Sequence, residues 1–255
     1  MKQFFIFFGT FILGVAVAAQ SVMAQQTLTF STLDKFAPFT WKEDNQAKGI
    51  DVDILEELCK RINVKCKISF VPWKRVVFNT KKGKSHGGFA GFKTSERETF
   101  AHFLDLPFHY SKYQIFVKKG SEFPYEKTQD LYGKKLGKNL GFNLGEELVN
   151  ATKEKKIFFD EARDASANIA KLQKDRIQGY VGNYHEILLA AKKMGLSGQI
   201  VPLPKPIRKP RGAFLLISKA AKMENKTQVL QQMNLALKQM YEDGTIEKIT
   251  SKYLQ

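Results

Sequence analysis

The sequence predicts an α/β fold in which most strands run parallel, and three observations support this prediction. The chain has 255 residues, of which 43% are hydrophobic and 26% are charged, a composition typical of a globular protein and not of a disordered one. Strand-like and helix-like segments alternate along the whole length after the first 24 residues. No internal repeat interrupts this alternation. A chain of this length can form one large domain or two small ones.

The expected elements follow from short apolar runs bounded by turn residues and from apolar residues that recur every three or four positions. Strands are predicted at Thr27–Leu33, Lys67–Val71, Gly87–Gly91, Tyr113–Lys118, Lys135–Lys138, Ile157–Phe159, Gln178–Val181, Ile200–Pro202 and Ala213–Ser218. Helices are predicted at Asp51–Ile62, Trp73–Lys81, Gly145–Lys155, Ala165–Lys174, Tyr184–Lys193, Lys226–Tyr241 and Ile246–Tyr253. The segment Pro202–Arg211 interleaves prolines with basic residues and is expected to be an extended connector.

Residues 1–24 differ in kind from the rest of the chain. Lys2 is their only charged residue, residues 4–19 are almost wholly apolar, and Val22-Met23-Ala24 supplies the small residues that a signal peptidase requires. We therefore expect a cleaved secretory signal, a mature chain that starts at Gln25 and a periplasmic location. An uncleaved anchor is the alternative, although an apolar run of about 16 residues is short of the ~20 that span a bilayer.

The charge balance is strongly basic. The chain has 41 Lys and Arg residues against 25 Asp and Glu residues, a formal charge of +16, which could indicate nucleic-acid binding. The basic residues are scattered through loops and helix ends, and neither a zinc-ligand set nor an RNA-binding aromatic motif accompanies them. We expect a solvated basic surface with a mild preference for anionic ligands, and no nucleic-acid partner, metal or cofactor.

Cys59 and Cys66 are the only two cysteines. The helical spacing of apolar residues ends near Ile62, and Lys65–Val71 has the pattern of a buried strand. A disulfide would therefore tie the end of a helix to the start of the next strand across a short turn, and two free buried thiols are the alternative. A metal or catalytic role is not expected, because no histidine lies nearby in the sequence.

Several motifs, taken in their order along the chain, resemble one known family. They are Phe36-Ala-Pro-Phe39, Gly49-Ile-Asp-Val-Asp53, Thr94-Ser-Glu-Arg97, Phe103-Leu-Asp105 followed by Pro107-Phe108, and the C-terminal segment 237–253. Each motif alone is weak, but together they cover essentially the whole mature chain and resemble family 3 periplasmic solute-binding proteins, the polar amino-acid receptors of ABC importers. Segment 57–66, which holds both cysteines, further resembles the disulfide-bearing segment of the basic amino-acid receptors in that family.

The resemblance implies a two-lobed periplasmic-binding-protein fold with two hinge crossover strands and a central ligand cleft. Tyr113–Lys118 would carry the chain out of the first lobe, and Gly212–Ser218 would bring it back. The first lobe would then comprise residues 25–115 and 213–255, and the second lobe residues 116–212. The resemblance also implies a monomer that captures an amino acid or related small carboxylate by lobe closure and delivers it to an inner-membrane ABC permease.

Two polar residues are candidates for binding a ligand. Arg97 matches the arginine that grips the ligand α-carboxylate through two charge-assisted hydrogen bonds. Judged from the residues alone, a surface pairing of Arg97 with Glu96 or Glu98 is the alternative. Asn143 lies just ahead of a predicted helix, where it either directs backbone N–H groups towards an anionic ligand group or serves as a plain helix cap.

Aromatic and small residues are expected to line the rest of the cleft. Phe36 and Trp73 match family positions at which aromatic rings enclose the ligand side chain, and core packing is the alternative for both. The hydroxyl-rich segment that precedes the arginine in the family is replaced here by a segment that holds Phe89, Ala90 and Phe92. Because Ser and Thr donors are missing there, the pocket is expected to be more apolar than in the family.

Further positions depart from the family pattern. Where α-amino-acid receptors carry an acidic residue that pairs with the ligand ammonium, this chain has Asn183, whose neutral amide cannot neutralise a buried ammonium. A first-lobe aspartate of the basic amino-acid receptors aligns with Leu33, and the aspartate usual after the second helix is replaced by His86. These changes predict a ligand with a carboxylate or other anionic group and a less demanding ammonium.

Two other functions are compatible with the resemblance. The fold occurs in periplasmic cyclohexadienyl dehydratase-like enzymes, and here His86, His185 and Glu186 would be the candidate acids or bases. The four histidines show neither metal-ligand spacing nor a nucleophile elbow, so we expect a receptor and not an enzyme. A sensor component that presents its ligand to a membrane receptor is the third possibility, and nothing in the chain separates it from a transport receptor.

Overall fold

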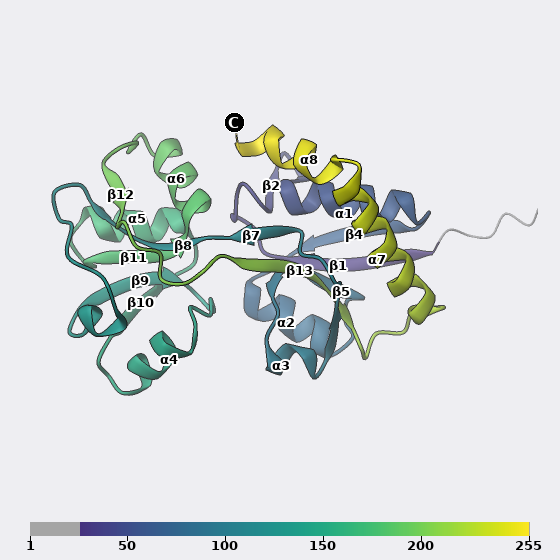
Figure 1. Ribbon diagram of the computed structural model, residues 1–255, viewed down its shortest axis with the longest axis horizontal. Helices are drawn as coiled ribbons and strands as arrows, with labels where there is room; N and C mark the ends of the chain where they lie inside the picture. The colour runs from purple at the N-terminus through teal and green to yellow at the C-terminus, as the bar shows by residue number, and fades with distance from the viewer. Residues whose placement is uncertain (1–25, 255) are drawn as a thin grey trace, which may run out of the picture.

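The computed structural model describes residues 26–254, which form two α/β lobes, each built on its own sheet (Figure 1). The predicted signal segment lies outside the described residues. Within residues 26–254, no helix combines the length and the apolar character needed to cross a membrane.

Lobe 1 is built on a sheet with the strand order β4-β1-β5-β13-β6, in which β7 also pairs with β13. Its strands are β1 (Thr27–Thr32), β4 (Lys65–Phe70), β5 (Gly87–Phe92), β6 (Ala101–Phe103), β7 (His109–Ser111) and β13 (Arg211–Ser218), and β2 (Trp41–Glu43) forms a separate hairpin with β3 (Gln46–Lys48). Figure 1 shows α1 (Ile50–Arg61), α7 (Lys226–Glu242) and α8 (Thr245–Leu254) on one side of this sheet, and α2 (Trp73–Lys81) and α3 (Ser95–Glu98) on the other.

Lobe 2 has a second sheet with the strand order β10-β9-β11-β8-β12. Its strands are β8 (Tyr113–Lys118), β9 (Lys135–Asn139), β10 (Phe158–Ala162), β11 (Gly179–Asn183) and β12 (Ile200–Pro202), and its helices are η1 (Thr128–Leu131), α4 (Glu146–Lys153), α5 (Ala165–Gln173) and α6 (Tyr184–Lys193). Tyr113, Ile115 and Val117 of β8 join the core on the α4 side, whereas Phe116 joins the core under α5 and α6. This alternation follows from the two-residue period of a strand and places apolar side chains on both faces of the sheet.

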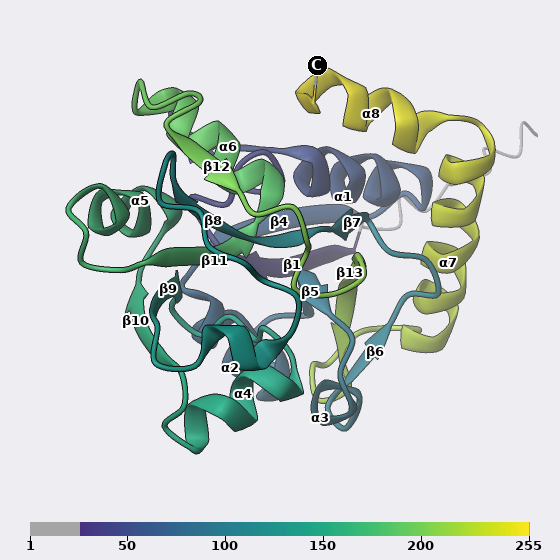
Figure 2. The ribbon, with the colours of Figure 1, turned by 60° about the vertical axis from the view of Figure 1, so that its left-hand side comes forward.

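The chain passes from lobe 1 to lobe 2 between β7 and β8, and returns between β12 and β13. The returning segment 203–210 contains neither helix nor strand, as predicted, but it bends repeatedly and is not extended, and Pro202 and Arg211 belong to the flanking strands. All of β8 pairs within the sheet of lobe 2, and the lobe division at residues 115 and 212 stays a prediction. Figures 1 and 2 both show α6 of lobe 2 on the same side of the molecule as α1, with α2 and α4 on the opposite side.

The prediction of mainly parallel strands is wrong, because both sheets are mixed. β1 runs parallel to β4 and β5, and β9 runs parallel to β10 and β11. β8, β12 and β13 instead pair antiparallel with their neighbours. The reason is topological: β13 enters the sheet of lobe 1 from the end at which β7 leaves it, so these two strands must run in opposite directions.

The prediction of a buried strand after Cys59 is also wrong. β4 is the edge strand of its sheet, and its side chains alternate between exposed and half-buried, because only β1 flanks it. The predicted disulfide is confirmed. Cys59 near the end of α1 is bonded to Cys66 of β4, with their Cα atoms 6.1 Å apart. The hairpin β2–β3 and the elements α3, β6 and β7 were not expected, because each is too short to show a periodic pattern.

Candidate ligand-binding site

A pocket between the lobes gathers residues from both of them. Its lining consists of Leu33, Phe36, Trp73, Ala90, Phe92, Arg97, Ser111, Tyr113, Phe142 and Asn143. The empty space amounts to about 370 Å³, including the part that is open to solvent. The part of this space that a water-sized molecule can enter is about 20 Å³, so in this arrangement of the lobes the pocket has room for little more than a water molecule. Most of the lining is apolar or aromatic, and Arg97 is its only charged member.

Six of the eight predicted ligand-binding residues line this pocket: Phe36, Trp73, Ala90, Phe92, Arg97 and Asn143. Their contact with a ligand stays a prediction. Phe89 is fully buried in the core of lobe 1, because alternation along β5 turns it away from the face that Ala90 and Phe92 share. Asn183 is also fully buried and does not belong to the lining.

Sequence reasoning did not assign Leu33, Ser111, Tyr113 or Phe142 to the pocket. Leu33 could have been predicted to line the pocket, since the resemblance aligns it with a first-lobe aspartate of the basic amino-acid receptors. Tyr113 begins a correctly predicted strand, but the strand pattern does not say which of its side chains meets a cleft. Ser111 and Phe142 lie in a three-residue strand and in a turn, where no periodic pattern indicates their direction.

The Arg97 side chain is held by the walls of the pocket. Its Nη1 donates to the backbone oxygen of Phe92 at 2.8 Å, and its guanidinium carbon lies 5.0 Å from the centre of the Trp73 ring. Burial lowers the pKa of Arg97 below its usual value. Within the described residues neither adjacent glutamate pairs with it, and Glu98 pairs with Lys93 at 3.1 Å instead. An arginine with unused donors that is already oriented can bind a carboxylate with little further ordering.

Two aromatic pairs bring the lobes together at the pocket. The rings of Phe36 and Phe142 meet edge to face with their centres 5.8 Å apart. The rings of Phe92 and Tyr113 meet in the same way at 5.7 Å. Each pair combines one residue of lobe 1 with one of lobe 2. A ligand that enters between the lobes therefore meets aromatic surface on both sides.

The backbone of Ala90 takes an unusual conformation at the pocket wall. Its φ is +66°, in the left-handed region that glycine adopts most readily. Such a conformation costs a non-glycine residue about 1–2 kcal/mol. Backbone strain of this kind is found most often at ligand sites and other functional positions.

Both polar atoms of the Asn183 side chain form hydrogen bonds within the protein. Its Oδ1 accepts hydrogen bonds from the backbone N–H groups of His185 at 3.0 Å and Glu186 at 3.2 Å, and thereby caps α6. Its Nδ2 donates to Ser111 Oγ at 3.1 Å. The amide is thus committed to holding a helix terminus and a pocket residue in place.

A buried chain of hydrogen bonds leads from Ser111 into lobe 1. Ser111 Oγ lies 2.7 Å from His109 Nε2, and His109 Nδ1 lies 2.7 Å from Asp51 Oδ1. Burial raises the pKa of the Asp51 carboxyl, while the charge of His109 and its hydrogen bond oppose this shift. The sequence did not indicate this chain, which fixes the orientation of Ser111 at the pocket wall.

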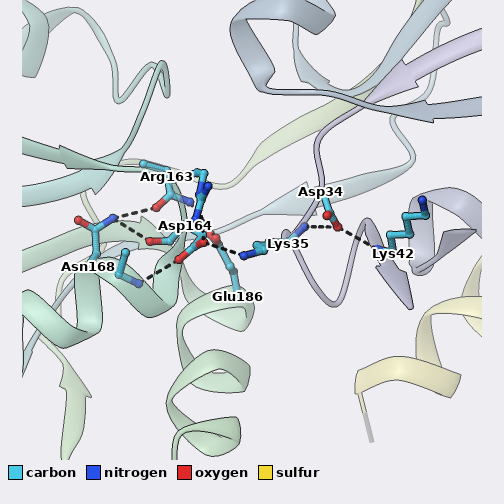
Figure 3. A network of polar contacts seen from close by, with 9 residues as sticks. Asp34, Lys35, Lys42, Arg163, Asp164, Asn168 and Glu186 are labelled. Carbon is cyan, nitrogen blue, oxygen red and sulfur yellow. Dashed lines mark hydrogen bonds and ion pairs between the residues drawn. The ribbon is translucent and has the colours of Figure 1, made fainter. Parts of the chain in front are cut away.

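Acidic residues lie at a second interlobe pocket that shares no lining residue with the first. Lys35 Nζ reaches from lobe 1 to Asp164 Oδ2 at 3.4 Å, as Figure 3 shows. Asp34 Oδ1 accepts the backbone N–H groups of Lys35 and Lys42. Glu186 Oε1 accepts a hydrogen bond from Asn139 Nδ2 at 2.8 Å. A larger neighbouring pocket shares Leu33, Trp73 and Phe142 with the first pocket and is lined in part by Asp34.

Comparison with known proteins establishes the family. Residues 28–255 match the bacterial extracellular solute-binding proteins, family 3. The chain belongs to this family. The chain is 28% identical to the putative ABC transporter arginine-binding protein 2 of Escherichia coli strain K12, over 94% of this chain and 96% of that protein. It is 27% identical to the probable amino-acid-binding protein YxeM of Bacillus subtilis strain 168, over 85% of this chain and 79% of that protein.

The fold of this solute-binding protein agrees with solved structures. An ancestral arginine-binding protein bound to arginine superposes with a TM-score of 0.77 at 23% identity, covering 91% of this chain and 99% of that one. The predicted two-lobed periplasmic-binding-protein fold is therefore confirmed. The family is named as extracellular, which agrees with the predicted export of the chain.

The residues considered for catalysis lie apart from the pocket of this solute-binding protein. His86, His185 and Glu186 are all missing from its lining. His86 Nδ1 accepts the backbone N–H of Thr29 at 3.0 Å on the far part of the sheet. Among residues 26–254, His, Cys, Asp and Glu nowhere gather in a group of three suited to a metal ion. The family and the named relatives are binding proteins and not enzymes.

Proposed function

We propose that this protein is the periplasmic receptor of an ABC importer and that it captures an amino acid or related small carboxylate between its two lobes. Its relatives in Escherichia coli and Bacillus subtilis are named as arginine-binding and amino-acid-binding proteins, which supports this class of ligand. An inner-membrane permease is the proposed partner, and the receptor is proposed to act as a monomer exported by a cleaved signal.

One observation carries the proposal for the ligand. The pocket between the lobes is lined by aromatic and apolar side chains, and Arg97 is the only charged residue among them. A guanidinium binds a carboxylate through two parallel charge-assisted hydrogen bonds, which gives both affinity and orientation. The aromatic rings then cover the remainder of the ligand, and closure of the lobes removes it from water.

The pocket also supports the predicted preference about the ligand ammonium. No acidic side chain lines it, and the amide of Asn183 is already used by Ser111 and the first turn of α6. An ammonium buried here would meet no acidic side chain in the pocket lining, and an unpaired buried charge is expensive. We therefore rank desamino carboxylates above α-amino acids as ligands.

The test is a thermal-stability screen of the mature protein after unfolding and refolding to remove any carried-over ligand. The panel holds the common α-amino acids, their desamino analogues, and amines of matched size without a carboxylate. A ligand at about 1,000 times its Kd stabilises the folded state by about 4.1 kcal/mol, which shifts the Tm of a chain of this size by roughly 8–16 °C. A shift with carboxylates and none with amines is the expected result. Shifts with amines alone would overturn the proposal.

A further inference from the structure

A second arginine, Arg208 of the returning connector, lies against the pocket from the side of lobe 2. Its guanidinium carbon is 4.9 Å from the centre of the Tyr113 ring and 5.0 Å from that of the Phe92 ring. Its Nη2 donates to the backbone oxygen of Asn143 at 3.3 Å. All three contacted residues belong to the pocket lining. Arg208 therefore lies against three residues of the pocket lining.

The hydrogen-bonding capacity of Arg208 is largely unused. Its Nε and Nη1 atoms are shielded from solvent and have no hydrogen-bond partner within residues 26–254. Buried polar atoms are nearly always paired, so two unpaired donors on one guanidinium point to a group that the protein itself does not supply. A charged guanidinium requires a hydrogen-bond partner more than a neutral group does, because leaving a buried charge unpaired is costly.

Two arginines bring positive charge to this pocket. Arg97 and Arg208 both donate to backbone oxygens, and within the described part of the chain neither forms an ion pair with a carboxylate. Burial lowers the pKa of Arg208 to about 10, and it lowers that of Arg97 as well. The α4 helix begins beside the same guanidinium, since a Cβ on its N-cap Gly145 would lie 3.6 Å from Arg208 Nη1. The positive end of the helix dipole thus adds to the two cations.

We infer that the ligand is a small organic dianion, such as a short dicarboxylate, with one anionic group on Arg97 and the second on the unpaired Nε and Nη1 donors of Arg208. The inference rests on the proposed function, because it takes the Arg97 carboxylate contact as its first anchor. One monocarboxylate would satisfy only one guanidinium. A cationic ligand such as arginine would bring a further positive charge to a site that holds no acidic side chain.

The test is isothermal titration calorimetry of the refolded mature protein with succinate and glutarate, with monocarboxylates of the same chain lengths, and with L-arginine. The Arg208→Met variant removes the guanidinium but keeps an unbranched side chain. Arg211→Met is the matched control. Arg211 lies equally close to the Phe92 ring, at 5.0 Å, and also donates to a backbone oxygen, but within residues 26–254 it has no buried nitrogen without a hydrogen-bond partner. Circular dichroism melting checks that both variants fold.

The expected result is that a dicarboxylate binds at least about 10-fold more tightly than the monocarboxylate of equal length. Arg208→Met should weaken dicarboxylate binding by about 10- to 100-fold, in line with the loss of hydrogen bonds to a charged group, and should leave monocarboxylate binding within about 3-fold. Arg211→Met should change the Kd of the dicarboxylate and that of the monocarboxylate by less than about 3-fold. This pattern would assign the second anionic group to Arg208.

Three results would overturn the inference: equal binding of mono- and dicarboxylates, equal losses in the two variants, and tighter binding of L-arginine than of any dicarboxylate. In the first two cases the carboxylate receptor of the proposed function survives, because a monocarboxylate still binds. Failure of every carboxylate to bind the folded protein would instead remove the proposed function together with the inference.

Discussion

Ser111 of lobe 1 accepts a hydrogen bond from Asn183 of lobe 2, with Oγ and Nδ2 3.1 Å apart. Both side chains are almost completely buried. Ser111 also lines the pocket and is held by His109, while Asn183 caps α6. The bond therefore connects the pocket, the core of lobe 1 and a helix terminus of lobe 2.

We expect Asn183→Ala to lower the free energy of unfolding by about 1–3 kcal/mol. The variant loses the helix cap, worth about 0.5–2 kcal/mol, and leaves two buried N–H groups and Ser111 with fewer partners. Urea unfolding followed by circular dichroism measures the change. Asn150→Ala on the exposed side of α4 is the control and should stay within about 0.5 kcal/mol of wild type. A loss below that size for Asn183→Ala would mean that the contact adds little.

We expect Arg97→Lys to weaken binding of the carboxylate ligand by about 10- to 100-fold. Lysine keeps the charge but cannot form two parallel hydrogen bonds, nor can it stack on Trp73 as the guanidinium does. Calorimetry with the strongest ligand of the thermal screen gives the Kd. The exposed Arg176→Lys variant in lobe 2 is the matched control and should bind like wild type. Unchanged affinity in Arg97→Lys would show that a point charge is enough.

We expect stability to fall as the pH rises from about 5 to 8 because of Glu186. Burial raises the pKa of this carboxyl from its ordinary value of 4.5 to about 8, a shift that the hydrogen bond from Asn139 opposes and the charge of Asp164 increases. Between these values the folded protein holds a proton that the unfolded chain has released, so unfolding becomes easier as the pH rises. The slope from one such group is at most about 1.4 kcal/mol per pH unit.

The Glu186→Gln variant tests this pH dependence, since it has no carboxyl to titrate and keeps an oxygen that can accept from Asn139. Urea unfolding of both proteins at about pH 5, 6.5 and 8 gives the two stability curves. The free energy of unfolding of the variant should rise steadily relative to that of wild type as the pH increases across this range. Parallel curves would show that Glu186 does not titrate there.

We expect removal of the disulfide by the double substitution Cys59→Ala and Cys66→Ala to cost about 2–3 kcal/mol. The bridge closes a short loop, and the chain-entropy relation gives a value of this size for it. For a chain of this length the Tm should fall by roughly 5–10 °C. Scanning calorimetry of both proteins with and without reductant measures it. The Tm of the variant should be the same with and without reductant. A wild-type Tm that stayed unchanged after complete reduction of the disulfide would contradict the expectation.

Local patterns in the sequence were sufficient for much of the secondary structure. α2, α6, β8 and β12 have the predicted bounds, because the apolar spacing of a helix and the apolar run of a strand are set by neighbours in the chain. The disulfide between Cys59 and Cys66 could also be predicted from the sequence, since both cysteines flank one short turn. The order of family motifs along the chain was enough to predict the two-lobed fold.

The tertiary structure alone decided strand direction and the composition of the pocket. Whether β13 runs parallel or antiparallel depends on where the chain returns from lobe 2, which no local pattern records. Trp73, Ser111 and Phe142 come from different parts of the chain, and only the docking of the two lobes brings them to one pocket. The sequence by itself determined most of the longer elements and the family, since these depend on nearby residues and on motif order. The pocket depends on contacts between residues far apart in the chain, and these exist only once the lobes have packed.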